Sequence, residues 1–208
     1  MQCTLCDGQT VHFCVISSRD YYRCTMCDGV QLATQQRLSP EKEENRYTLH
    51  KNDINDTGYQ KFVMPLVDAI KKKHSENDIG LDFGCGTGPV IAELLLTAGY
   101  DIEKYDPFFA QDYSVFEQTY DFIFCCEVIE HFYSPKQEFS LLHTLLKPEG
   151  KLYCKTNLFL PSIDFKNWWY KNDSTHVFFY SKDTIKYIKQ AYNFSSVCIE
   201  KEFVVFEK

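Results

Sequence analysis

Short apolar runs alternate with amphipathic stretches along most of the chain after residue 60. The runs at residues 79–84, 100–106, 120–127 and 151–158 are rich in β-branched and aromatic residues and predict buried strands. The stretches at residues 62–73, 89–99 and 181–192 repeat their apolar positions with helical spacing. Residues 195–208 predict a closing pair of strands. Such alternation is typical of an α/β fold with a mostly parallel sheet covered on both faces.

A fourth helix is predicted where Ser134, Pro135 and Gln137 precede the amphipathic residues 138–147. Serine suits the N-cap, and proline is favoured at the first helical position. Gln137 lies where it would complete a capping box with Ser134. We expect the helix to end at the sequence PEG, residues 148–150.

Two cysteine pairs mark the N-terminal segment. Cys3 and Cys6 form one C-x-x-C pattern, and Cys24 and Cys27 form a second. Two such pairs supply four thiolates for a tetrahedral zinc site, and the alternating residues between them predict a hairpin. We therefore predict a structural zinc ribbon over residues 1–36, with a redox dithiol as the alternative. His12 and Cys14 are spare candidate ligands that more simply face in or out of the hairpin.

Residues 37–60 are polar, without a sustained period, and predict a connector to an α/β domain over residues 61–208. The net charge of −7 argues against nucleic acid as a partner, because phosphate binding needs clustered Lys and Arg. The first residues lack the pattern of a signal peptide, and no apolar run reaches the length of a membrane span. The expected location is the cytoplasm.

Three glycines occupy alternate positions in the sequence LDFGCGTGP, residues 81–89, directly after a predicted strand. Glycine lets the backbone turn tightly and approach a ligand. A dinucleotide fingerprint would need glycine at position 89, where the chain has Pro89. The pattern D-x-G-x-G-x-G from Asp82 to Gly88 instead resembles motif I of the class I methyltransferases that use S-adenosylmethionine.

The resemblance implies a Rossmann-like class I methyltransferase sheet whose last strand is antiparallel. It also implies that the loop passes beneath the methionine part of the cofactor, and that Asp106 accepts hydrogen bonds from both ribose hydroxyls. The sequence EVIEH, residues 127–131, looks like the family's fourth-strand motif and would open toward the cofactor's methyl group. The implied cofactor-binding residues are Asp82, Gly84, Cys85, Gly86, Gly88, Asp106, Pro107 and Glu127.

A narrower resemblance links the chain to uncharacterised bacterial methyltransferases that begin with the same cysteine knuckle and carry a segment like WWYKNDSTHVFFYS, residues 168–181. Sugar C-methyltransferases also begin with such a knuckle, but they carry a large additional C-terminal domain. The expected acceptor is a small molecule, with a sugar or another metabolite as candidates.

Candidate residues for handling the acceptor follow the fourth and fifth strands of the predicted sheet. The catalytic candidates are His176, His131 and Glu127. An unperturbed histidine titrates near pH 6.5, so His176 suits proton removal, and Asp173 is placed to orient its ring. Anchoring of the loop is an equal alternative for His176, and shaping of the cofactor site is favoured for His131. Further candidates are Glu130, Trp168, Trp169 and Tyr170. The two tryptophans suit a lid over an organic ligand, and anchoring of the loop to the core is an equal alternative for one of them.

Two other functions remain open. Certain ribosomal RNA guanine methyltransferases combine a zinc ribbon with this fold, so an RNA base is the alternative acceptor. The acidic ribbon and the lack of a basic stripe beyond residues 71–73 count against that reading. A non-catalytic zinc-ribbon scaffold is the other alternative, and the intact glycine loop with Asp106 argues against it.

Overall fold

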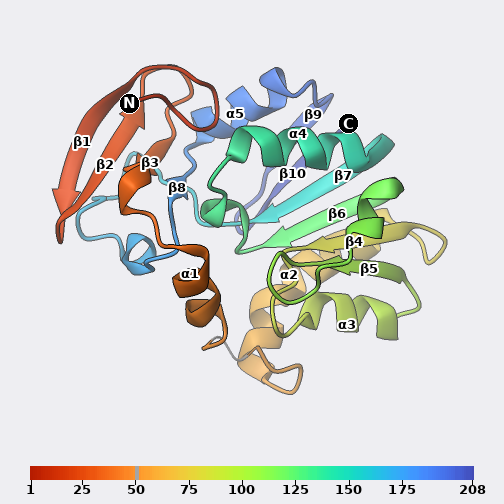
Figure 1. Cartoon of the computed structure of the whole chain (residues 1–208). Coiled ribbons are helices and arrows are strands. Elements are labelled where there is room, and N and C mark those ends of the chain that lie inside the picture. Colours follow the sequence, from red (N-terminus) through yellow and green to blue (C-terminus); the bar gives the residue numbers. More distant parts are fainter. Residues whose placement is uncertain (50–51) are drawn as a thin grey trace.

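The computed structural model describes residues 1–49 and 52–208, and two sheets organise them (Figure 1). Six strands form the central sheet, in the spatial order β5 (Asp101–Tyr105), β4 (Ile79–Phe83), β6 (Tyr120–Cys126), β7 (Leu146–Lys155), β10 (Val204–Glu207) and β9 (Ser196–Ile199). Neighbours from β5 to β7 pair in parallel, whereas β10 is antiparallel to both β7 and β9. The predicted α/β class, with a mostly parallel sheet and an antiparallel last strand, is confirmed.

Helices cover both faces of the central sheet, as Figure 1 shows. These helices are α2 (Thr57–Lys73), α3 (Val90–Thr97), α4 (Pro135–Leu145) and α5 (Lys182–Ala191). Successive residues of β6 point to opposite faces, so Ile123 packs in a cluster with α4 and α5 while Phe122 and Phe124 pack with α2 and α3. Burial on both faces explains the nearly continuous apolar character of this strand.

Three helix N-termini differ in how they are capped. Asp56 accepts hydrogen bonds from the backbone of Gly58 and Tyr59 at the start of α2. Ser181 and Thr184 form a reciprocal capping box at the start of α5. The capping box predicted at Ser134 is wrong: this residue is the N-cap of α4, but its side chain makes no capping bond. Proline at the first helical position fixes the entry of the chain there without such a bond.

The second sheet contains strands from both ends of the chain. Its order is β1 (Thr10–Ile16), β2 (Arg19–Cys24), β3 (Val30–Leu32) and β8 (Phe178–Phe179), and every neighbouring pair is antiparallel. The predicted hairpin is therefore present, and it is extended by a strand about 150 residues further along the chain. The small helix α1 (Pro40–Tyr47) follows this sheet, and short 3₁₀ helices lie at Thr34–Gln36, Tyr113–Glu117, Ile129–His131 and Trp169–Asn172.

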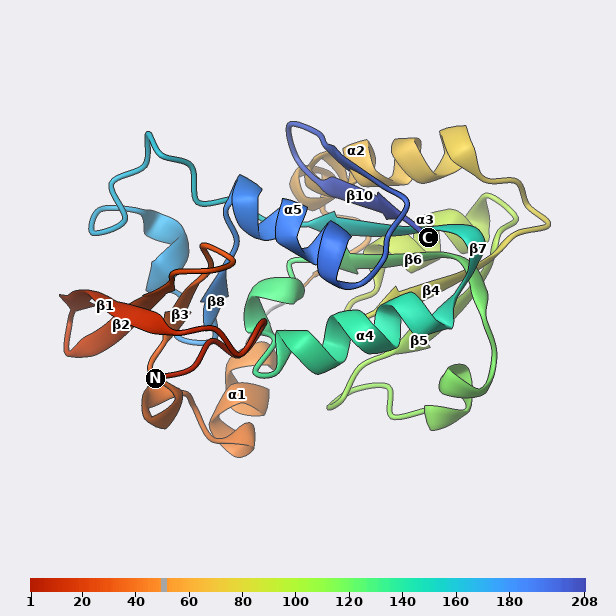
Figure 2. The same cartoon turned by 90° about the horizontal axis from the view of Figure 1, so that it is seen from above.

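Residues 156–177, which connect β7 to β8, are termed the aromatic loop. Seen from above, this loop and the small sheet lie side by side at one end of the central sheet (Figure 2). Arg19 of β2 fixes the loop, because its guanidinium donates hydrogen bonds of 3.3–3.4 Å to four backbone carbonyls: those of Lys171, Asp173, Ser174 and His176. Among the helices described, none combines the length and apolar character that a membrane crossing requires.

Replacement of Arg19 by alanine should lower the free energy of unfolding by about 1–3 kcal/mol, because charge-assisted hydrogen bonds to the loop are lost. The matched control is Arg23→Ala on the same strand, whose partly exposed ion pair with Asp28 should contribute only about 0–1 kcal/mol. Urea denaturation measures both. Equal losses in the two variants would show that Arg19 does not anchor the loop.

Candidate active site

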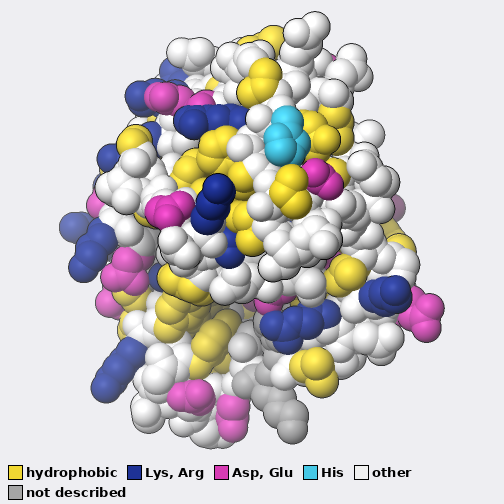
Figure 3. Space-filling model, turned by 90° about the vertical axis from the view of Figure 1, so that its left-hand side faces the viewer, with side chains coloured by type: hydrophobic (Ala, Val, Ile, Leu, Met, Phe, Trp, Pro, Cys, Tyr) yellow, Lys and Arg dark blue, Asp and Glu magenta, His cyan; other side chains and the backbone are white. Residues whose placement is uncertain are grey.

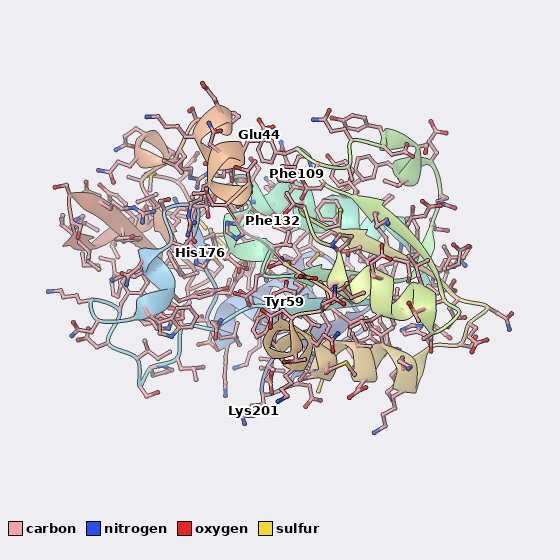
Figure 4. The ribbon with its side chains drawn as sticks, turned by 90° about the horizontal axis from the view of Figure 1, so that it is seen from below. Glu44, Tyr59, Phe109, Phe132, His176 and Lys201 are labelled. Atoms are coloured by element: carbon pink, nitrogen blue, oxygen red, sulfur yellow. The ribbon has the colours of Figure 1, made fainter. Side chains whose placement is uncertain are left out.

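A cavity of about 750 Å³ opens at the edge of the central sheet where the parallel strands end. Tyr59, Phe109, Phe132 and His176 come from four separate segments and surround this region between α1, α2 and the sheet (Figure 4). Every residue that the sequence predicted to bind cofactor or act in catalysis lines the cavity: Asp82, Gly84, Cys85, Gly86, Gly88, Asp106, Pro107, Glu127, His131 and His176. The structure thus brings the two predicted sets together in one space.

The glycine loop follows β4 and turns under the cavity. Gly84 and Gly86 have φ of 85° and 61°, in the left-handed region that favours glycine. A Cβ at Gly84 would lie 2.7 Å from the side chain of Val128. The loop leads into α3 at Val90, so the N–H groups of the first helical turn point toward the cavity end of the sheet.

Asp106 follows β5 and holds the glycine loop against the next turn. Its Oδ2 accepts the backbone N–H of Gly86 at 2.9 Å, and its Oδ1 accepts those of Phe108 and Phe109 at 2.8 and 3.1 Å. Three backbone donors fix the carboxylate at the cavity wall with lone pairs to spare.

Asp82 lies at the end of β4 with 5% of its surface exposed. Burial raises the pKa of its carboxyl to about 8, and the nearby Asp106 carboxylate acts in the same direction, while Lys104 acts against it. The acid that opens the glycine motif is therefore protonated at neutral pH in the chain alone.

Glu127 is the first residue after β6 and has a positive φ of 53°, an uncommon conformation for a residue with a side chain. Its backbone N–H donates to the carbonyl of Lys155 at 2.8 Å, which fixes this turn against β7. Burial raises the pKa of its carboxyl to about 7, although Tyr170 and Lys155 lower it. Its Oε1 is buried, and no described residue donates a hydrogen bond to it. Strain and an unsatisfied acceptor in one residue are features typical of a functional site.

Glu130 lies behind the cavity wall and is completely buried. The hydroxyl of Tyr170 donates to its Oε1, and the hydroxyl of Thr156 donates to its Oε2 at 3.0 Å. Its backbone carbonyl accepts the N–H of Val177 at 2.9 Å. Burial, together with the adjacent carboxyl of Glu127, raises the pKa of Glu130 well above its usual range. This residue joins the ends of β6 and β7 to the aromatic loop.

His131 and His176 face each other, with ring centroids 4.7 Å apart. The Nδ1 atom of His131 lies 3.1 Å from the carbonyl of Thr175, and that of His176 lies 2.7 Å from the carbonyl of Tyr170. Whether Asp173 orients the His176 ring stays a prediction: against the effect of burial, His176 is among the groups that lower the pKa of Asp173, but the described hydrogen bonds of the Asp173 carboxylate go elsewhere. The carboxylate of Asp173 is instead bonded to Thr175 and Arg46, since its position two residues before Thr175 favours a local turn.

Sequence reasoning missed part of the cavity wall. Helix α1, which lies in the predicted connector, contributes Glu43, Arg46 and Tyr47, and no periodic signal in that polar stretch indicated this role. The two tryptophans differ in exposure. Trp168 is 8% exposed and packs in the core of the aromatic loop, whereas Trp169 is 65% exposed and lies at the cavity rim.

The four cysteines predicted to bind zinc, Cys3, Cys6, Cys24 and Cys27, also lie close together, beside the small sheet. The Sγ atoms of Cys3 and Cys27 are 3.6 Å apart, and those of Cys6 and Cys24 are 3.3 Å apart. The Sγ atom of Cys24 also accepts backbone N–H groups of Met26 and Cys27. His12 and Cys14 are not members of this cluster, and His12 instead pairs with Asp20 at 3.6 Å.

The sheet, its antiparallel last strand and the glycine loop define a class I methyltransferase fold. Residues 55–199 match the family described as methyltransferase domain, and the chain belongs to this family. No curated protein sequence matches the chain.

Solved structures share the fold at low sequence identity. A 1,6-didemethyltoxoflavin-N1-methyltransferase from Burkholderia thailandensis, with bound 1,6-didemethyltoxoflavin and S-adenosylhomocysteine, aligns with a TM-score of 0.59 at 12% identity, over 94% of this chain and 97% of that one. An O-methyltransferase family protein from the same organism aligns with a TM-score of 0.53 at 13% identity, over 79% of this chain. The chain spans only 61% of the length of that second protein.

The protonated state of Asp82 predicts a pH effect on stability. Between its ordinary pKa of 3.8 and its folded value of about 8, the folded chain holds a proton that the unfolded chain releases. Stability should therefore fall as the pH rises through this window, by up to about 1.4 kcal/mol per pH unit from this residue. Asp82→Asn should remove that contribution.

Urea denaturation at several pH values from about 5 to about 8 checks this expectation, with the exposed Asp68→Asn on α2 as the control. Relative to wild type, the Asp82→Asn variant should gain stability steadily toward the upper end of the range. Parallel stability curves for wild type and Asp82→Asn would contradict it.

Proposed function

We propose that this protein transfers a methyl group from S-adenosylmethionine to a small organic acceptor bound in the same cavity. The observation that carries the proposal is the shared cavity, which has the glycine loop and Asp106 on one side and Glu127, His131 and His176 on another. A volume of about 750 Å³ lies within the range of small-molecule sites.

The proposed cofactor subsite uses the residues that the sequence indicated. Loop backbone from Gly84 to Gly88 and the first turn of α3 would hold the carboxylate of the methionine part. Asp106 would accept hydrogen bonds from the ribose hydroxyls, since its carboxylate is already oriented by three backbone donors. Tyr59 and Phe62, which line the cavity from α2, would contact the adenine ring.

Methyl transfer from a sulfonium is an in-line displacement, so the protein must align the acceptor, exclude water and provide for loss of the acceptor proton. Glu127, His131 and His176 are proposed to handle the acceptor, because they lie together on the wall next to the glycine loop. Trp169, exposed at the rim, is placed to close over a bound ligand.

Surface charge supports a small acceptor over RNA. On the face of the molecule shown in Figure 3, Lys and Arg are interspersed with Asp and Glu rather than gathered in one basic patch. The net charge of the chain is −7, and electrostatic attraction to a phosphate backbone requires the opposite balance.

The cysteine cluster is proposed to hold one structural zinc ion. Four sulfurs in two C-x-x-C pairs fit a closed tetrahedral site, and the N–H donors to Cys24 would support a bound thiolate. Because the small sheet includes β8, such an ion would stabilise the end of the aromatic loop as well as the N-terminal hairpin.

Labelled methyl transfer from S-adenosylmethionine into separated fractions of small metabolites, RNA and protein tests the function. Label should enter the small-metabolite fraction, and Asp106→Ala should weaken S-adenosylhomocysteine binding by about 1.5–3 kcal/mol through loss of charge-assisted hydrogen bonds. The control is Asp101→Ala, exposed at the other end of β5. Label in RNA alone, or unchanged affinity in a folded Asp106→Ala chain, would reject the corresponding part of the proposal.

Elemental analysis of protein purified without chelator should find about one zinc per chain, since the site has four thiolate ligands. Cys24→Ser should lose the metal and lower the thermal stability, whereas Cys198→Ser, at an exposed position outside the cluster, should keep both. Less than about half an equivalent of zinc in the wild-type protein would count against the site.

A further inference from the structure

A second group of metal-ligating side chains lies at the part of the cavity wall that is proposed to handle the methyl acceptor. It is far along the sequence from the four cysteines. The ligand atoms of Glu130, His131 and His176 all lie within 4.8 Å of one another. First-row divalent ions take imidazole nitrogen and carboxylate oxygen at roughly 2.0–2.2 Å, so small side-chain movements would bring all three atoms onto one ion. His131 and His176 also line the cavity, which gives such an ion access to a bound acceptor.

Both histidine rings are held in the way that metal-binding histidines usually are. Backbone carbonyls of Thr175 and Tyr170 accept from the Nδ1 atoms of His131 and His176, at 3.1 and 2.7 Å. These contacts favour the tautomer with the proton on Nδ1, in which Nε2 carries the lone pair. Glu130 is oriented similarly, because each of its carboxyl oxygens accepts one hydroxyl hydrogen bond and retains a further lone pair.

Charge at this wall also favours a bound cation. Glu130 is fully buried, and the carboxyl of Glu127 lies beside it with an Oε1 atom that no described residue satisfies. Lys155 acts electrostatically on Glu127, but its ammonium group pairs with Glu202 at 3.2 Å and lies over the ring of Phe62. A divalent ion would stabilise the deprotonated form of both carboxyl groups and give Glu127 a partner.

We propose that Glu130, His131 and His176, with Glu127 completing the set, bind a divalent first-row metal ion that holds a hydroxyl group of the methyl acceptor. This inference rests on the proposed function, because it concerns the same cavity. Two imidazoles and two carboxylates form a mixed nitrogen and oxygen site, which suits ions such as Mn²⁺ more than the all-sulfur cysteine cluster does.

The ion would direct methylation to oxygen. Metal coordination lowers the pKa of a bound hydroxyl, whose proton passes to solvent water. The resulting oxyanion retains a lone pair that forms the new C–O bond, while the sulfonium C–S bond breaks with its electron pair left on sulfur. A nitrogen acceptor would have its only lone pair engaged by the metal and could not attack. The acceptor class is therefore a hydroxyl compound.

Binding of Mn²⁺ tests the site without knowledge of the acceptor. The full chain is titrated with Mn²⁺ in the presence of S-adenosylhomocysteine, and the electron paramagnetic resonance signal of free Mn²⁺ gives the bound fraction. We expect about one Mn²⁺ per chain. Glu130→Gln and His131→Asn, which retain the approximate shape of the side chains, should each weaken binding at least about tenfold. His12→Ala, at an exposed histidine on β1, is the matched control and should bind as wild type does.

The two proposals fail in distinguishable ways. If wild-type protein binds S-adenosylhomocysteine but takes up Mn²⁺ only above millimolar concentration, or if the folded Glu130→Gln and His131→Asn variants bind Mn²⁺ as well as His12→Ala does, the metal site is wrong and the methyltransferase proposal stands. If S-adenosylhomocysteine does not bind, the proposed function itself fails. Retained S-adenosylhomocysteine affinity shows that a variant is folded. If Glu130→Gln or His131→Asn does not fold, Glu127→Gln is tested for Mn²⁺ binding in its place.

Discussion

The buried carboxyl group of Glu130 is the contact on which the geometry of the cavity wall depends. It accepts hydrogen bonds from Tyr170 within the aromatic loop and from Thr156, which starts that loop directly after β7, while its own backbone lies in the 3₁₀ helix Ile129–His131 that follows β6. Burial of a carboxyl group lowers the stability of the folded chain unless its oxygens accept hydrogen bonds. The three segments are therefore stable only when they meet in this arrangement. The same arrangement places His131 opposite His176.

The small sheet supports this wall from outside the methyltransferase core. β8 joins the aromatic loop to β3, and Arg19 binds the carbonyls that precede and include His176. An aromatic cluster that includes Tyr21, Trp168 and Phe179 fills the space between the sheet and the loop. The strand pairing, the hydrogen bonds from Arg19 and the aromatic cluster together keep the side chains of the loop in fixed positions. Alignment of two reactants requires such preorganisation.

One part of the cavity wall offers backbone donors and an oriented carboxylate, and another part offers titratable side chains, because of how the parallel strands end. Parallel strands end at one edge of the sheet, so the residues that follow β4, β5 and β6 come together there regardless of their separation in sequence. The glycine loop and Asp106 provide backbone donors and an oriented carboxylate, whereas Glu127 and the two histidines provide titratable groups. Helix α1 and the aromatic loop complete the lining of the cavity.

The sequence by itself determined the features that depend on neighbouring residues. Strand and helix periods, the glycine loop with its positive φ at Gly84 and Gly86, the two C-x-x-C pairs and the position of Asp106 all follow from local spacing. Only the tertiary structure decided which distant segments meet. The pairing of β3 with β8, the entry of α1 into the cavity wall, and the meeting of Glu130 and His131 with His176 have no local signal. These contacts arise because buried polar groups and strand edges must find partners, and the partners that satisfy them lie far away along the chain.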